Sequence, residues 1–266
     1  MSFTSFRALV RRYYRLHARR ELPWRKTRDP YRILVSEVML QQTQVVRVIP
    51  FYAEFTKRFP TAKRLASAPL ADVLKAWQGL GYNRRAKMLH AAAKRIVEQG
   101  MPRDVPGLEK LPGVGPYTAR AIAAFAYNQG VIVVETNIRT AILHHFFPKQ
   151  KKVSDRKIER VLAKLLPEGG ARDWYSALMD YGAHLKRSGI SHNARSLHYA
   201  KQPRFTGSLR EARGAILRVL AQGATPRARL TGILGADRRE QVVRALDALC
   251  AEGLVRTERR RYALAD

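Results

Sequence analysis

The sequence is poor in cysteine, in acidic residues and in long apolar runs. Cys250 is the only cysteine among 266 residues, so the chain can form no internal disulfide and no four-cysteine metal or iron–sulfur centre. No apolar run approaches the roughly 20 residues of a membrane-spanning helix. The N-terminus also lacks the apolar core and small-residue cleavage site of a secretory signal. We therefore expect no membrane partner and a cytoplasmic location.

Acidic residues are few relative to basic ones. Asp and Glu number 21 against 50 Lys and Arg, which gives a formal charge of +29. A polyanion is the natural partner of such a chain, because each phosphate that it neutralises releases condensed counterions. Charge alone does not distinguish DNA from RNA, the ribosome or acidic lipid. Hydrophobic residues make up 46%, which is enough for a packed core and argues against wholesale disorder.

Apolar residues recur at helical spacing over most of the first 200 residues, and glycines and prolines separate the segments. There is no alternation of strands with helices, and no glycine-rich phosphate loop. Residues 131–134 are a β-branched run that could form one isolated strand. We predict a mainly α fold. The principal predicted helices cover 3–18, 31–52, 117–128, 137–147, 155–165 and 171–186.

The C-terminal part has a different pattern. Residues 200–208 resemble a linker, and we expect domains at 1–202 and 209–266. Three helices followed by a basic hairpin outline a winged helix, whose third helix would enter the major groove of DNA while its wing touches phosphate. A winged helix that contacts protein is the alternative. The predicted elements are helices at 209–220, 227–234 and 238–252, strands at 253–257 and 261–264, and wing arginines Arg256, Arg259, Arg260 and Arg261.

The sharpest local signal is the run Leu-Pro-Gly-Val-Gly-Pro-Tyr-Thr at 111–118. Gly113 and Gly115 allow a tight turn between two helices and let a phosphate approach the backbone. The next helix starts there, so its free N–H groups and positive dipole end face that phosphate. We predict that Gly113, Gly115 and Thr118 bind a DNA strand without reading its sequence. A turn that uses glycine for geometry alone is the alternative.

Three further stretches accompany this hairpin. They are LPWR at 22–25 with RDPY at 28–31, VSEVMLQQTQ at 35–44, and WQGLGY at 77–82. With them, the chain over about residues 7–200 resembles the helix-hairpin-helix DNA glycosylase superfamily of endonuclease III and the MutY-type adenine glycosylases, and is closer to the MutY type. The resemblance implies a core of two helical subdomains with the active site in the cleft between them. It also implies a monomer that acts on double-stranded DNA bearing a lesion or mismatch.

Cleavage of an N-glycosidic bond requires an acid that protonates the leaving base and a carboxylate beneath the cationic sugar. Glu37 lies in an otherwise apolar helical run, where loss of hydration would raise its pKa and suit it to the role of acid. An exposed Glu on a polar helix face is the alternative. By resemblance, Glu37 matches the family's glutamate, which protonates the base and later activates water.

Two more catalytic positions follow from the resemblance. Glu135 stands where the family has an aspartate, so the carboxylate that stabilises the oxocarbenium ion is kept but is one methylene longer. Tyr117 occupies the position of the Schiff-base lysine in bifunctional relatives. A phenol cannot form that imine, so we expect a monofunctional enzyme with little or no lyase activity. The tyrosine would instead support the carboxylate.

The resemblance also assigns residues that contact DNA. Gln42 and Tyr82 match the positions that fill the gap left by a flipped base, while Arg84 and Arg85 are expected to meet phosphate. Trp24 and Tyr82 as ordinary core aromatics are the alternative. The residues expected to line the base pocket are Trp24, Arg25 and Asp180.

The chain departs from the family in its cofactor and its C-terminus. Lys186, Asn193, Ser196 and Gln202 stand where relatives have cluster cysteines, so we expect no [4Fe–4S] cluster, and a basic segment at 186–201 that folds by packing. The family's carbonyl-bound cation, K⁺ or Na⁺, would lie on Leu111 and Val114. Residues 209–266 are too short for the domain that inspects 8-oxoguanine.

We therefore expect a base excision repair glycosylase that removes adenine opposite 8-oxoguanine or guanine. Removal of thymine or uracil opposite guanine, or of a deaminated purine, is a close alternative. A non-catalytic DNA-binding protein is a second, and Glu135 in place of aspartate is its best support. A transcription regulator is a third, but it leaves Glu37, Gln42 and Tyr117 without a role.

Overall fold

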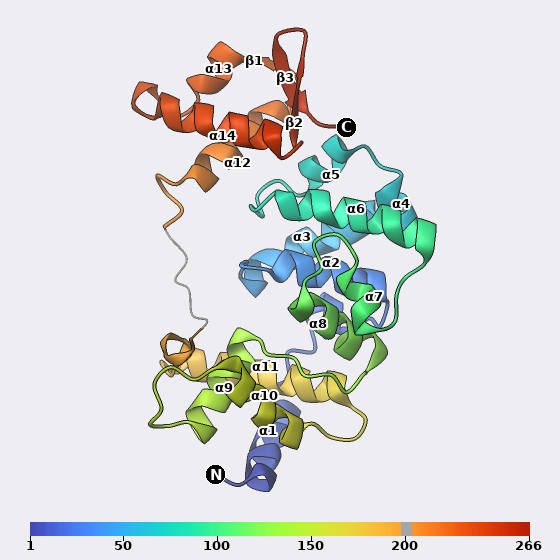
Figure 1. Ribbon diagram of the computed structural model, residues 1–266, viewed down its shortest axis with the longest axis vertical. Helices are drawn as coiled ribbons and strands as arrows, with labels where there is room; N and C mark the ends of the chain where they lie inside the picture. The colour runs from blue at the N-terminus through green and yellow to red at the C-terminus, as the bar shows by residue number, and fades with distance from the viewer. Residues whose placement is uncertain (198–203) are drawn as a thin grey trace. The chain divides into compact units, whose positions relative to one another are not determined.

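The computed structural model describes residues 1–197 and 204–266 (Figure 1). Contacts divide the chain into two compact units. The first comprises Met1–Glu37, Pro102–Lys110 and Val114–Lys201, and the second comprises Val38–Met101, Leu111–Gly113 and Gln202–Asp266. The domain boundaries expected at 202 and 209 stay a prediction, and the proposed linker lies partly outside the described residues.

The first unit is built around α11, which packs against α9, α1 and α8. Its core contains Phe6, Ile142, Trp174 and Tyr175, all 3% exposed or less. The elements with most of their residues in this unit are α1 (Phe3–His17), η1 (Pro23–Arg25), α2 (Pro30–Leu40), α7 (Val105–Glu109), α8 (Pro116–Tyr127), α9 (Thr136–Phe146), α10 (Asp155–Leu165), α11 (Ala171–Arg187) and η2 (Asn193–Arg195).

Close contact between α9 and α11 depends on a glycine. A Cβ atom at Gly182 of α11 would lie 1.9 Å from the backbone oxygen of Asn137 on α9. Any side chain there would force the two helices apart. This contact sets the distance between α11 and the start of α9, where Glu135 is found.

The second unit contains a helical part and a small sheet. Strands β1, β3 and β2 form an antiparallel sheet in that order. Together with α12, α13 and α14 this is the outline of a winged helix, as predicted. The elements are α3 (Val45–Arg58), α4 (Ala62–Ala66), α5 (Leu70–Ala76), α6 (Arg84–Gln99), α12 (Leu209–Leu220), β1 (Thr225–Pro226), α13 (Arg227–Thr231), η3 (Ala236–Arg238), α14 (Arg239–Ala251), β2 (Val255–Glu258) and β3 (Arg261–Leu264).

Two predictions of secondary structure are wrong. Residues 31–52 form two helices, because the chain turns after Leu40 and Gln42 has a positive φ of 55°. Residues 131–134 are not a strand. The Tyr175 hydroxyl donates to Val131 O at 2.7 Å and accepts from Val133 N at 3.2 Å, so a side chain supplies the hydrogen bonds that a neighbouring strand would provide.

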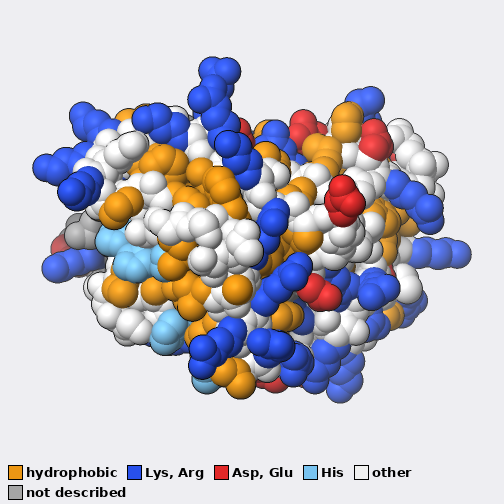
Figure 2. Space-filling view, turned by 90° about the horizontal axis from the view of Figure 1, so that it is seen from below, with side chains coloured by type: hydrophobic (Ala, Val, Ile, Leu, Met, Phe, Trp, Pro, Cys, Tyr) orange, Lys and Arg blue, Asp and Glu red, His pale blue; other side chains and the backbone are white. Residues whose placement is uncertain are grey.

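Basic side chains are spread over the surface, as the excess of Lys and Arg requires. Figure 2 shows one face on which Lys and Arg greatly outnumber Asp and Glu. Among the described residues, no helix is long and apolar enough to span a membrane.

Candidate active site

Glu37 lies on α2 and is 7% exposed. Its carboxyl accepts a hydrogen bond at 3.3 Å from the Tyr117 hydroxyl. Burial raises the pKa of Glu37 to about 7; the hydrogen bond from Tyr117 opposes this rise, and the charge of Glu135 adds to it. A carboxyl with this pKa holds its proton for a large fraction of the time near neutral pH, which is the state a general acid requires.

Tyr117 lies in the first turn of α8, after Gly115 at the N-cap and Pro116 at the first helical position. Burial, together with the charges of Glu37 and Glu135, raises the pKa of Tyr117 well above its ordinary value. The phenol therefore stays protonated and acts as a hydrogen-bond donor. Its donation to Glu37 joins α8 to α2.

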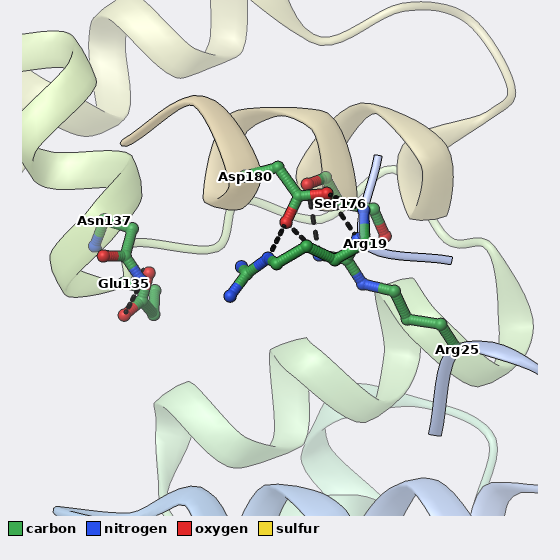
Figure 3. A network of polar contacts seen from close by, with 6 residues as sticks. All are labelled: Arg19, Arg25, Glu135, Asn137, Ser176 and Asp180. Atoms are coloured by element: carbon green, nitrogen blue, oxygen red, sulfur yellow. Dashed lines mark hydrogen bonds and ion pairs between the residues drawn. The ribbon is translucent and has the colours of Figure 1, made fainter. Parts of the chain in front are cut away.

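Glu135 is the N-cap residue of α9. One carboxylate oxygen accepts from Asn137 N at 2.7 Å, and the other accepts from Asn137 Nδ2 at 3.1 Å and from the Thr136 hydroxyl. The longer side chain thus folds back onto the start of its own helix (Figure 3), as N-cap carboxylates do. Its charge raises the pKa of both Glu37 and Tyr117, so the three predicted catalytic residues interact within one unit.

Asp180 on α11 is buried, and its carboxylate faces Arg19 and Arg25 (Figure 3). It accepts from Arg25 at 2.6 and 2.8 Å, from Arg19 Nε at 2.5 Å and from Arg19 N at 3.0 Å. Burial would raise the pKa of this carboxyl, but the hydrogen bonds and charges of Arg25 and Arg19 outweigh it and lower the pKa. Asp180 therefore holds Arg25 in place.

Of the other residues predicted for the base pocket, Arg25 belongs to this ion pair and Trp24 precedes it in the chain. Arg25 also donates to Ser176 O at 3.3 Å, and its side chain is 13% exposed. Trp24 is half-buried in the same short helix, η1. Sequence reasoning missed Arg19, since nothing in the run of basic residues around it distinguishes it from its neighbours.

The predicted hairpin contains the sharp turn that its glycines suggest. Gly113 has a φ of 76°, and a Cβ atom there would lie 2.6 Å from Met88 Cβ. Gly115 is exposed directly before α8. The side chain of Thr118 is buried, so a phosphate contact at this residue would use its backbone N–H. Leu111 and Val114 have buried side chains, and a cation on their carbonyls stays a prediction.

The residues predicted to fill the gap left by a flipped base lie on turns of the second unit. Gln42 and Tyr82 have positive φ values of 55° and 48°, which non-glycine residues adopt at a cost that is often associated with functional sites. Both line a pocket of about 410 Å³, which also includes Arg84 and Gly113. Arg84 is exposed at the start of α6.

The prediction that Arg85 meets phosphate is wrong. Its guanidinium turns inward and donates to the carbonyl oxygens of Val38, Met39 and Gln41 at 2.8, 2.9 and 2.5 Å. Burial lowers the pKa of Arg85 to about 10. Arg85 therefore caps the C-terminal end of α2, where the carbonyl oxygens have no helical partner.

The segment that would carry cluster cysteines is attached to α9 by hydrogen bonds. Thr140 Oγ1 donates to Asn193 Oδ1 at 3.0 Å, and His144 Nδ1 shares a hydrogen bond of 3.1 Å with His192 Nε2. In the part of the chain that the structure describes, no group of three or more His, Cys, Asp or Glu side chains could hold a metal. Gln202 lies outside that part, and the absence of a cluster stays a prediction.

Solved structures with a similar fold define the class of protein. A thermostable thymine-DNA glycosylase superposes with a TM-score of 0.60 at 26% identity, covering 68% of this chain and 86% of that one. Endonuclease III in a non-covalent DNA complex gives 0.57 at 20% identity, covering 78% and 92%. The fold is that of the helix-hairpin-helix glycosylases.

Sequence relatives identify the family within that class. The family of HhH-GPD superfamily base excision DNA repair proteins matches residues 35–168. An adenine DNA glycosylase of Mycolicibacterium smegmatis is 42% identical over 272 residues, covering 94% of this chain and 92% of the relative. An adenine DNA glycosylase of Mycobacterium tuberculosis is 39% identical over 278 residues, covering 95% and 90%. This chain belongs to the HhH-GPD superfamily of base excision DNA repair proteins.

Proposed function

We propose that this protein is a monofunctional DNA glycosylase that removes adenine mispaired with 8-oxoguanine or guanine in double-stranded DNA. The observation that carries the proposal is the buried Glu37, whose pKa is raised to about 7 and whose carboxyl is held by Tyr117. The choice of adenine rests on the two mycobacterial relatives, which are adenine DNA glycosylases.

In the proposed reaction, Glu37 donates its proton to a ring nitrogen of the flipped base. The bond between that base and C1′ of the deoxyribose then breaks, and the bonding electrons leave with the base. The carboxylate of Glu135 stabilises the resulting oxocarbenium ion. Water adds to C1′ and gives its proton to Glu37, which restores the acid and leaves an abasic site.

The monofunctional character is proposed from Tyr117. A bifunctional glycosylase needs an amine that forms a Schiff base with the sugar. Tyr117 provides only a protonated phenol, which is hydrogen-bonded to Glu37. Strand breakage should therefore require alkali after the base has left.

The charged surface supports DNA as the partner. Gln42 and Tyr82 would fill the gap left by the flipped base, and Arg84 would meet phosphate. The backbone N–H groups near Gly115 lie at the start of α8, where a helix attracts a phosphate. Arg25, held by Asp180, would contact the base.

We propose a monomer without an iron–sulfur cluster, since the chain has one cysteine. We also propose that K⁺ or Na⁺ binds the hairpin carbonyls.

The test uses a panel of duplexes, each bearing one mismatch or lesion. The panel includes adenine opposite 8-oxoguanine, guanine or cytosine, thymine and uracil opposite guanine, and hypoxanthine. Each reaction is analysed for strand breaks with and without hot alkali. We expect alkali-dependent breaks at adenine opposite 8-oxoguanine or guanine. Glu37→Gln should reduce the rate by about 10²–10⁴-fold, while Glu54→Gln, at an exposed position on α3, should keep it.

Each outcome has a definite meaning. Unchanged cleavage by Glu37→Gln would show that Glu37 is not the general acid. Strand breaks without alkali would contradict the monofunctional mechanism. Cleavage only at thymine or uracil opposite guanine would show that the substrate is one of these bases and not adenine. The structural likeness to a thymine-DNA glycosylase makes this the second candidate. Binding of every duplex without cleavage would favour a non-catalytic DNA-binding protein.

A further inference from the structure

Two arginines from distant parts of the sequence hold the side chain of Tyr82. The Tyr82 hydroxyl accepts a hydrogen bond of 2.9 Å from Arg210 Nη1. The guanidinium carbons of Arg210 and Arg85 lie 5.4 and 5.3 Å from the centre of the Tyr82 ring. Both distances are within the range at which a guanidinium attracts an aromatic face.

The two arginines are themselves restrained. Arg85 is fixed to the carbonyl oxygens at the end of α2. Arg210 lies in the first turn of α12, and its guanidinium is also 5.9 Å from the ring centre of Phe205. Tyr82 is therefore held by one arginine from the helical part of its unit and by another from the C-terminal segment, residues 204–266.

Separate contacts attach the C-terminal segment near α6. Lys87 Nζ donates to Glu252 O at 2.5 Å, at the end of α14. Glu252 also accepts two hydrogen bonds from Arg213 of α12, at 2.8 and 2.6 Å. Because Arg213 and Arg210 lie on the same helix, these contacts help to fix the position of Arg210 relative to Tyr82.

The contact lies at the pocket that Gln42 and Tyr82 share. Arg210, Arg213 and Glu252 line this pocket together with those two residues. Tyr82 keeps a φ of 48° there, a conformation that the surrounding structure must stabilise. The arginine contacts supply such stabilisation.

We propose that Arg210 is a positioning residue that orders the Tyr82 side chain for entry into the DNA base stack. The C-terminal segment thereby contributes to base flipping through Tyr82, in addition to any contact of its own with DNA. Ordering the ring before DNA binds reduces the entropy that is lost when the ring inserts. This inference rests on the proposed function, in which Tyr82 fills the gap left by the flipped base.

The test compares Arg210→Ala with Arg218→Ala. Arg218 is an exposed arginine on the same helix, so the control removes the same charge. Base flipping is followed by the fluorescence of 2-aminopurine next to the target adenine, and excision is followed under single-turnover conditions with saturating protein. We expect Arg210→Ala to slow both by about tenfold, the effect of losing one hydrogen bond to a charged group. We expect Arg218→Ala to change only the affinity for DNA.

A double-mutant cycle with Tyr82→Phe separates positioning from a general loss of structure. Because Tyr82→Phe removes the hydrogen-bond acceptor, the effects of Arg210→Ala and Tyr82→Phe on the flipping rate should be non-additive. Additive effects, or a flipping rate in Arg210→Ala equal to that in Arg218→Ala, would overturn the proposal. If the wild-type protein excised no base, the proposed function would fail, but the fluorescence cycle would still report on Arg210.

Discussion

At the scale of the residue, the feature that matters most is a carboxyl group removed from water. Glu37 is 7% exposed, and Tyr117 is the hydrogen-bond donor that approaches it at 3.3 Å. Burial disfavours the charged form, and the nearby charge of Glu135 disfavours it further. The same two effects suit Glu37 to the proposed role of acid, and they make its ionised form costly to the fold.

This cost predicts how the stability of the protein depends on pH. Folding raises the pKa of Glu37 from 4.5 to about 7, so the folded state binds the proton more tightly than the unfolded state. Tighter proton binding at Glu37 contributes about 3 kcal/mol to the free energy of unfolding below pH 4.5. This contribution is lost as pH rises through 7. Glu37→Gln cannot ionise, so the variant should become increasingly more stable than the wild type between pH 5 and pH 8.

The measurement is urea unfolding of both proteins across that pH range. Glu54→Gln changes an exposed side chain. Its free energy of unfolding should differ from that of the wild type by an amount that does not grow with pH. A constant difference between Glu37→Gln and the wild type would mean that Glu37 has an ordinary pKa. The argument for a general acid would then lose its electrostatic basis.

At the scale of the element, α11 organises the first unit. It packs against α1, α8 and α9, and its Asp180 fixes Arg25 of η1 and Arg19 through four hydrogen bonds. Its Gly182 allows close approach of α9, whose N-cap is Glu135. One helix thus positions a residue expected in the base pocket and the start of the helix that carries the second carboxylate.

Removing the charge of Asp180 should therefore affect both stability and excision. Asp180→Asn leaves two arginines without their partner, and breaking a buried ion pair costs about 3–5 kcal/mol. We expect a lower free energy of unfolding by about that amount, measured in urea. Excision should slow as well, because Arg25 is no longer held.

The matched control is Asp173→Asn on the same helix, where the side chain is exposed. A surface substitution of this kind should change the free energy of unfolding by about 0.5 kcal/mol. An equal, small effect of both substitutions would show that Asp180 does not hold the arginines in solution.

At the scale of the whole molecule, charge is the dominant property. The formal charge of +29 and the basic face in Figure 2 favour a surface that follows a phosphate backbone. Binding of this kind is independent of base sequence, and it is separate from the chemistry proposed at Glu37.

Affinity for DNA should therefore fall steeply with salt. If the protein contacts six to ten phosphates, its affinity should fall by about 10³–10⁵-fold between 50 and 200 mM salt. Fluorescence anisotropy with a labelled duplex measures this slope. Arg84→Ala should reduce the slope by about one phosphate contact. An affinity that does not change with salt would exclude a phosphate-binding surface.

The sequence predicted the elements better than the contacts between them. The helix expected at 155–165 is found at Asp155–Leu165, because local apolar spacing encodes a surface helix. The prediction for 31–52 failed at Gln42, which has a positive φ; Arg85, more than forty positions away, donates to the adjacent Gln41 carbonyl. The strand expected at 131–134 failed because Tyr175 satisfies that backbone.

By itself, the sequence determined which chemical groups are available. It supplies an acid in an apolar helix, a glycine hairpin and a single cysteine. It also places a tyrosine where a bifunctional glycosylase would need an amine. Tertiary structure alone decided which groups meet, because burial and charge depend on residues that are distant in the chain. Tyr117 reaches Glu37 across 80 positions, and Arg19 reaches Asp180 across 161. Only folding could give Glu37 its raised pKa, since the unfolded chain leaves that carboxyl in water.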